Sequence, residues 1–377
     1  MPALSSARCV EVKNRIWGPT VNIDFHYGVV YVVARLGGLA AQDATIVAHA
    51  CQYVDDATQD GLLYFAGGET FERFATAHKL FDYKNMFNER NRLVWTPFHF
   101  LPGGVGASLE ERAICKPDSP IAHAIVKRAI GHKGADNALH RLGVTLHTYV
   151  DTWAHQGFAG IECASNKVHH LEAEDCTREQ WLTWFAQFTE RTLDDIKSNL
   201  LTDAFPLGHG AALHYPDQPW AKWHYINGHN VRVERDNLAE FCQAAEMACR
   251  VVRAFCDGDE AFADKQGLPG EAGAALRNLM NTSRSTDETA RLETIRNAVT
   301  LGVIPGLRET IPSYVGKGAG SWKYQATGIL SGDDGHQRPA WSEVFETSDY
   351  RKFHDAVKEH RFVVTQEILP AHQLRLV

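Results

Sequence analysis

One segment restricts the fold of this chain more than any other, the run from Leu142 to His155, where polar residues recur inside an apolar sequence. His147, Asp151 and His155 are spaced four residues apart. On an α-helix, each step of four residues returns a side chain to almost the same face, so these three side chains form one stripe. The apolar neighbours predict that the stripe faces the protein interior, where unpaired polar groups are costly. A divalent metal ion would satisfy the stripe, and a hydrogen-bonded His–Asp–His ladder between helices is the alternative.

The wider composition supports a search for metal ligands, because the 377-residue chain contains 19 histidines and imidazole is the commonest metal ligand among side chains. The formal charge of −8 gives no overall attraction to duplex nucleic acid, so we expect nucleic acid at most as a substrate. Hydrophobic residues make up 44% of the chain, which excludes global disorder. The N-terminus lacks a basic start followed by an apolar segment, and no apolar stretch is long enough to span a bilayer. These features predict a cytoplasmic protein without a transmembrane segment.

Helical periodicity recurs along the chain, whereas sustained period-two alternation is scarce. We therefore expect an all-α fold, a multi-helix bundle with long ordered loops. Residues 204–230, which are rich in glycine, proline, histidine and aromatic residues, are interpreted as one such loop. The polar, acidic, glycine-containing stretch 258–273 is the best candidate boundary. It predicts a helical metal-binding catalytic domain over 1–257 and a helical C-terminal extension over 258–377 that packs on the same core.

Three segments before Leu142 carry further candidate ligands. Asp24 and His26 stand at the start of an apolar helix, where a short polar residue can also act as a cap. The adjacent Asp55 and Asp56 end another apolar helix, a position where the helix dipole favours cations, so a metal ion would compensate them unless they are simply solvated. Periodicity alone does not choose between these two acids. His99 lies between two phenylalanines in a proline-bounded loop, which is typical of core histidines as well as of ligands.

A later segment offers a further set. His209, flanked by glycines, can complete another metal site with Asp217 or His214, and the competing pair is His170 and Glu174, spaced i, i+4. Polar side chains that simply face solvent would explain either pair without a metal. The candidate ligands before Leu142, together with His147, Asp151 and His155, are imidazoles and carboxylates without cysteine, a set that suits zinc, manganese or iron. Because they are more numerous than one tetrahedral ion needs, we expect two or three ions.

The order of these motifs resembles that of the phospholipase C/P1 nuclease superfamily, whose members are α-helical and carry a trinuclear zinc cluster. The superfamily motif Leu-Gly-x-x-Leu-His-x-x-x-Asp, followed by a histidine, is similar to residues 142–155, and Pro-Phe-His-Phe is repeated at residues 97–100. Tyr53-Val54-Asp55 is similar to the family's Trp-Ala-Asp, which favours Asp55 over Asp56. The resemblance covers residues 22–217, and the Asp-Phe-His-Tyr and Gln-Tyr-Val-Asp-Asp segments suggest a bacterial branch without an assigned activity.

The resemblance implies a phospholipase C/P1 nuclease-like bundle and a ligand set. Asp55, His99, His147 and Asp151 would hold one zinc ion, and Asp151 would bridge to a second ion that His26 also binds.

The third ion would be held by His155 with a later histidine and acid, either His209 and Asp217 or His170 and Glu174. This site is where the chain departs from the family, because Asp151 and His155 are only four residues apart and lack the usual intervening proline.

A second departure concerns the N-terminus. The family uses a free N-terminal tryptophan as a ligand, whereas residues 1–25 precede His26 here, with Asp24 as the candidate replacement.

The expected activity is metal-dependent hydrolysis of a small-molecule or lipid phosphoester, phospholipase C-like or nuclease-like. Asp151 would serve the reaction as the bridge between ions, and Asp24 or Asp56, where not a ligand, would act as general base. One rival is an HD-type phosphohydrolase, although the chain's His-Asp dipeptide, His354-Asp355, is remote from the cluster in sequence. Two further rivals are a di-iron oxygenase on a helical scaffold and a non-catalytic protein with a structural metal cluster.

Overall fold

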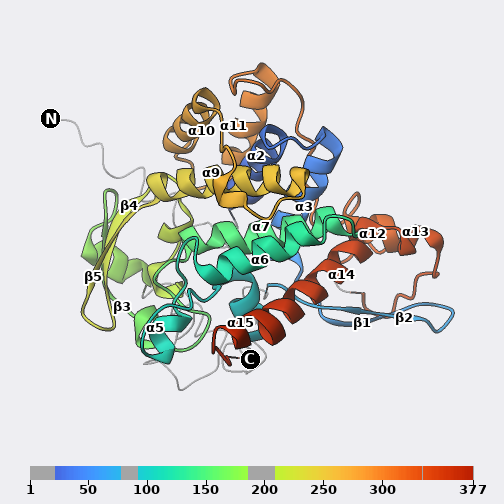
Figure 1. Ribbon diagram of the computed structural model, residues 1–377, viewed down its shortest axis with the longest axis horizontal. Coiled ribbons are helices and arrows are strands. Elements are labelled where there is room, and N and C mark those ends of the chain that lie inside the picture. The colour runs from blue at the N-terminus through green and yellow to red at the C-terminus, as the bar shows by residue number, and fades with distance from the viewer. Residues whose placement is uncertain (1–21, 78–91, 186–208, 333, 377) are drawn as a thin grey trace.

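The computed structural model describes residues 22–77, 92–185, 209–332 and 334–376, and helices form most of this part of the chain (Figure 1). Two small antiparallel sheets accompany the helices, so the predicted all-α fold is wrong. The sheets comprise β1 (Gly61–Tyr64) with β2 (Thr70–Arg73), and β3 (Val168–Ala173), β4 (Lys222–Asn227) and β5 (Arg232–Asp236) in the order β3-β4-β5. Strands of four to six residues contain too few alternations to stand out in the sequence. The predicted loop over 204–230 accordingly contains β4.

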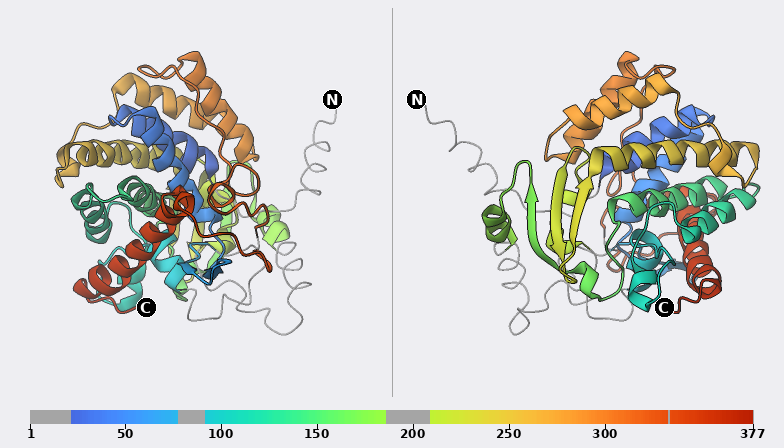
Figure 2. Two further views of the ribbon diagram at one scale, coloured as in Figure 1. Left: turned by 90° about the vertical axis from the view of Figure 1, so that its right-hand side faces the viewer. Right: turned by 60° about the vertical axis from the view of Figure 1, so that its left-hand side comes forward.

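The long helices lie in layers (Figure 1 and Figure 2). The central layers contain α2 (Val30–Leu36), α3 (Ala41–Asp56), α6 (Pro120–Gly131), α7 (Ala138–Ala154) and α9 (Asn237–Asp257). The outer layers contain α10 (Gly270–Thr282) and α11 (Glu288–Leu301) at one end and α14 (Asp349–Phe362) at the other. A π-helix, η2 (Asp24–Val29), runs directly into α2.

Short helical segments connect and cover these layers. They are α4 (Arg92–Val94), η5 (Trp95–His99), α5 (Leu109–Ala113), η6 (Ala164–Asn166), η7 (Gly210–Ala212), η8 (Tyr215–Asp217), η9 (Phe262–Asp264), α12 (Trp322–Thr327), α13 (Glu343–Glu346), η10 (Val363–Ile368) and α15 (Leu369–Ala371). Among them, η5 and η8 carry predicted ligands, so the segments between the long helices supply chemistry as well as connections.

Helix α7 lies at the centre of the fold and packs against α3, α6, α9 and α14. It approaches α3 most closely at Gly143, where an added Cβ would lie 2.5 Å from the carbonyl oxygen of Val47 and 2.6 Å from the Cβ of Ala50. A side chain of any size at position 143 would therefore separate the two helices. Because glycine has no side chain, α3 can approach α7 closely, and the candidate ligands at the end of α3 lie near those of α7.

Helices on both sides of residue 258 contribute to one hydrophobic core, which includes Tyr27 and Leu142 as well as Leu292 and Leu369. Helix α11 packs on η2, and α14 packs on α7. The boundary between 257 and 258 remains a prediction. In the described ranges, no helix combines the length and apolar character needed to cross a bilayer.

We predict that Gly143→Ala lowers the free energy of unfolding by about 1–3 kcal/mol, the usual effect of overpacking, because the carbonyl of Val47 belongs to a helix and has little room to move. Chemical denaturation would measure the change. Gly134→Ala is the matched control, since nothing lies within 4 Å of the position that its Cβ would take. Equal stability of the two variants would contradict the close packing of α3 on α7.

Candidate metal centre

The Asp151 carboxylate, on the last turn of α7, is the centre of a buried group of imidazoles. Its Oδ1 lies 3.1 Å from His26 Nε2. Its Oδ2 lies 3.2 Å from His147 Nε2, 3.3 Å from His99 Nδ1 and 3.5 Å from His155 Nδ1. These histidines come from η2, α7, η5 and the residue that follows α7. Three segments that are distant in sequence therefore meet at one carboxylate.

The first group of ligand atoms combines Asp55, His99 and His147, whose nearest atoms all lie within 4.8 Å of one another. Asp55 Oδ1 is 3.8 Å from His99 Nδ1 and 3.7 Å from His147 Nε2. Asp151 Oδ2 faces the same two nitrogens. The four side chains predicted for the first ion are thus brought together, and they present two nitrogen and two oxygen donors.

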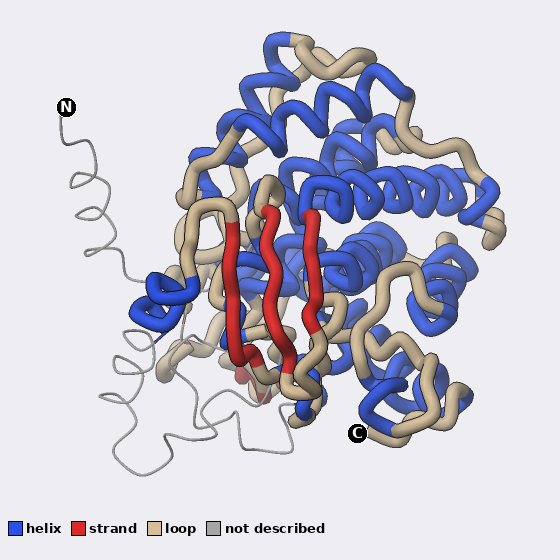
Figure 3. The backbone as a smooth tube through the Cα atoms, turned by 90° about the vertical axis from the view of Figure 1, so that its left-hand side faces the viewer, coloured by secondary structure: helices blue, strands red, loops and turns tan. Residues whose placement is uncertain are grey.

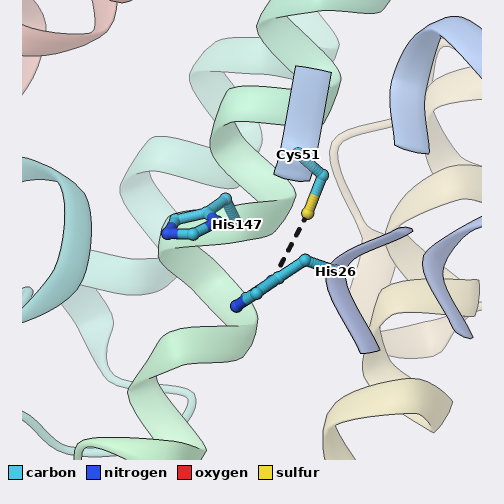
Figure 4. Close-up of side chains that lie close together, drawn as sticks. All are labelled: His26, Cys51 and His147. Atoms are coloured by element: carbon cyan, nitrogen blue, oxygen red, sulfur yellow. Dashed lines mark hydrogen bonds between the residues drawn. The ribbon is translucent and has the colours of Figure 1, made fainter. Parts of the chain in front are cut away.

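The second group, which also contains Cys51 and His147, centres on His26 (Figure 4). Its Nε2 faces Asp151, while its Nδ1 is 3.6 Å from the Cys51 sulfur. Its ring stacks on that of His147 with centroids 4.2 Å apart. The prediction of a cysteine-free ligand set overlooked Cys51, although its position four residues before Asp55 on α3 was a signal that the two share a helix face.

The third group contains His155, His209 and Asp217. Asp217, on η8, lies 3.9 Å from His155 Nε2 through Oδ1 and 3.9 Å from His209 Nε2 through Oδ2. The alternative pair, His170 and Glu174, does not belong to this third group. His170 belongs to β3, and Glu174 lies in the turn that follows. Their i, i+4 spacing has no significance because the segment is not helical.

Backbone carbonyls orient two of the histidines. His99 Nε2 donates to the carbonyl oxygen of Thr76 at 2.7 Å, and His155 Nδ1 donates to the carbonyl oxygen of His99 at 2.7 Å. Because a carbonyl only accepts, these bonds place the proton on the bonded nitrogen of each neutral ring. When the rings are neutral, as metal binding requires, His99 Nδ1 and His155 Nε2 are then the lone-pair donors that face the carboxylates, which is how metal-binding histidines are usually held.

The electrostatics of the centre favour a cation. Burial and the nearby Asp151 raise the pKa of Asp55 well above its usual value. Burial lowers the pKa of His147 to about 3, so this ring is neutral. Burial also acts to lower the pKa of His26, but the Asp151 carboxylate outweighs it and raises this pKa to about 10.

Two carboxylate oxygens of the centre, Asp55 Oδ2 and Asp217 Oδ2, are buried without a hydrogen-bond partner in the described structure. Divalent ions would satisfy these oxygens and offset the clustered carboxylates. The imidazole and carboxylate donors fit zinc, manganese or iron, and the expected number of two or three ions remains a prediction.

Asp24 and Asp56, the predicted candidates for a ligand and a general base, are not brought into the cluster. Asp24 forms a bidentate, buried ion pair with Arg291, at 2.7 Å and 2.8 Å. Asp56 accepts a 2.7 Å hydrogen bond from the Tyr314 hydroxyl and lies 3.6 Å from Lys317. These partners come from the last quarter of the chain, and the local sequence around Asp24 or Asp56 does not predict them.

A protein-family model described as a family of unknown function (DUF6765) matches residues 21–368. No curated protein and no solved structure matches the chain.

We predict that Asp24→Asn destabilises the protein without removing metal. Arg291 would remain buried without a charged partner, which should lower the free energy of unfolding by about 3–5 kcal/mol. Denaturation and elemental analysis of the same preparation would measure both quantities. Glu367→Gln breaks an exposed pair with Arg128 and should lower the free energy of unfolding by less than about 1 kcal/mol. Loss of metal from Asp24→Asn at unchanged stability would instead identify Asp24 as a ligand.

We also predict that metal binding releases protons. With a pKa of about 10, His26 is protonated at neutral pH in the metal-free protein, and ligation requires its neutral form. Zinc binding at pH 7 should release about one proton per chain from His26, and the apparent affinity should rise with pH up to the His26 pKa of about 10. Calorimetric titrations in buffers of different ionisation enthalpy would count the protons. An affinity that does not vary with pH would contradict the assignment of His26.

Proposed function

The chain belongs to the DUF6765 family, and we propose that it is a metal-dependent hydrolase that cleaves phosphoester bonds with two or three divalent ions, most simply zinc. One observation carries the proposal, the convergence of Asp55, His99, His147 and Asp151 in a single group of ligand atoms. These residues are the ones that the resemblance to the phospholipase C/P1 nuclease superfamily implies for the first ion. Their spacing in the sequence alone does not require that they meet.

The arrangement of Asp151 supports more than one ion. Its Oδ1 faces His26, and its Oδ2 faces His99 and His147, so the two oxygens point to different sets of nitrogen donors. His155 extends the same helical stripe toward Asp217. Adjacent groups that share a carboxylate are typical of sites in which ions act together.

The residues of the chain supply orientation, charge and proton acceptors for hydrolysis. Divalent ions bound in such a site lower the pKa of coordinated water and neutralise charge on phosphoryl oxygens. The carbonyl oxygens of Thr76 and His99 hold two imidazoles in one tautomer. Asp55 and Asp217 each keep one buried oxygen free of hydrogen-bond donors in the described structure, and these oxygens are the available acceptors for a cation or a proton.

Two of the rival interpretations are less well supported. An HD-type phosphohydrolase would use the His354-Asp355 dipeptide, but His354 is buried, and burial together with the cations Arg73 and Lys323 lowers its pKa to about 3. Flanking cations are unfavourable to a metal ion at that position. A di-iron oxygenase typically uses several glutamates, whereas the groups around Asp151 contain histidines, aspartates and one cysteine.

We predict that the zinc-loaded protein hydrolyses bis(p-nitrophenyl) phosphate or p-nitrophenylphosphorylcholine and that chelator abolishes the activity. His147→Ala and Asp151→Asn should each lower kcat/KM at least about a hundredfold, because even outer-shell partners of metal ligands can reach that effect. His229→Ala is the control, since this histidine is half-exposed on the turn after β4 and pairs with Glu110.

The same activity assays, combined with a measurement of bound zinc, distinguish a catalytic metal site from a structural one. Retention of bound zinc without hydrolysis of either phosphodiester by the wild-type protein would favour a structural metal cluster. Hydrolysis that persists in chelator-treated protein would contradict metal dependence. Two substrates are needed because one reports phosphodiester cleavage in general and the other carries a lipid-type headgroup.

A further inference from the structure

The three-stranded sheet β3-β4-β5 lies at one side of the molecule (Figure 3), and the side chains on its two faces differ in chemistry. Leu171 and Tyr225 are buried on its inner face. The outer face carries three half-buried side chains of ligand type, His170, Glu172 and His224. We propose that these three side chains form a separate site for one divalent transition-metal ion. The inference does not rest on the function proposed above.

The strand register brings the three side chains together. Glu172 on β3 is paired with His224 on β4, and His170 lies two residues before Glu172, so all three project from the same face. Glu172 Oε1 is 2.9 Å from His170 Nε2, and its Oε2 is 3.5 Å from His224 Nε2. One ligand atom from each residue lies within 4.8 Å of the others. Both imidazoles thus direct their Nε2 atoms at the Glu172 carboxylate.

Two basic residues near this site are each paired with another acid. Lys222, on the same face, pairs with Asp236 at 3.2 Å, and Arg232 pairs with Glu234 at 3.0 Å. Each of these two cations therefore already has its own acid. A carboxylate that faces two imidazoles, beside paired cations, is well placed to share a metal ion with them.

The outer site is separated from the main centre by the sheet and an aromatic layer. Tyr225, on the inner face, stacks on Phe158 with ring centroids 5.3 Å apart. Phe158 in turn lies 6.0 Å from the ring of His209, a member of the third ligand group. An ion on the outer face is consequently not one of the ions around Asp151.

The donor set determines the class of ion. Two imidazoles with one carboxylate favour Cu²⁺, Zn²⁺ and Ni²⁺, whereas Mg²⁺ and Ca²⁺ prefer sites made of oxygen atoms. The side chains of His170, Glu172 and His224 are 26%, 44% and 20% exposed, so solvent reaches the site. Three protein ligands leave a coordination position for water or an external ligand.

Equilibrium dialysis of the full-length protein against Zn²⁺ tests the proposal. The wild-type protein should bind one more Zn²⁺ per chain than the double variant H170A/H224A. Glu172→Gln, which keeps the shape of the side chain, should weaken binding of that additional ion at least about tenfold. His169→Ala is the matched control, because this neighbouring histidine on β3 is exposed and outside the group.

Paramagnetic resonance of Cu²⁺ gives a second measurement. Cu²⁺ added to the zinc-loaded protein should displace the exposed outer Zn²⁺, because Cu²⁺ binds such donors more tightly. Hyperfine coupling to two imidazole nitrogens is expected in the wild type and should be lost in H170A/H224A. Equal zinc stoichiometry in the wild type and H170A/H224A would overturn the proposal. The proposal would also be overturned if His169→Ala reduced binding of the additional Zn²⁺ as much as Glu172→Gln does. Metal loss from His147→Ala with the outer ion retained would separate this site from the main centre.

Discussion

The structure depends on the burial of one carboxylate, Asp151, among four imidazoles. An isolated carboxylate in a protein interior is strongly destabilising, so its partners have to be in place when the core forms. Here the partners come from η2, η5 and the C-terminal end of α7. Packing of the helices in the folded protein therefore places the four imidazoles around Asp151. We propose that a divalent ion completes this arrangement, because it would satisfy the buried carboxylate oxygens of Asp55 and Asp217 that lack a hydrogen-bond partner in the described structure.

A layer of backbone contacts supports the ligands. The absence of a side chain at Gly143 lets α3 approach α7, which places Asp55 beside His147. The short π-helix η5 links two ligand groups, because the His99 ring bonds to the Thr76 carbonyl while the His99 carbonyl accepts from His155. A displacement of η5 would disturb both groups at once. Geometry of this kind is typical of sites that must hold reacting atoms in fixed positions.

The C-terminal part of the chain removes ligands from the candidate set as well as burying the site. Arg291 on α11 neutralises Asp24, and Tyr314 with Lys317 holds Asp56. A buried acid can be compensated by a metal ion or by a guanidinium group, and local sequence does not distinguish the two. The sheet β3–β4–β5 makes the opposite contribution, because strand pairing creates a group of ligand type that the i, i+4 spacing of His170 and Glu174 did not predict.

The sequence by itself determined the polar stripe of α7, because the period of a helix follows from backbone geometry. It also identified most of the ligand-type residues that meet around Asp151. It did not reveal the sheets, because strands of four to six residues contain too few alternations to stand out, and β3 also pairs with a strand about 50 residues later in the chain. Only the tertiary structure decided that Asp55 faces the histidines while Asp56 bonds to Tyr314. Adjacent residues of a helix point about 100° apart, so the partner of each depends on the segment that packs on its side of the helix. The same applies to Asp24, whose partner is 267 residues away, a distance over which local sequence carries no information.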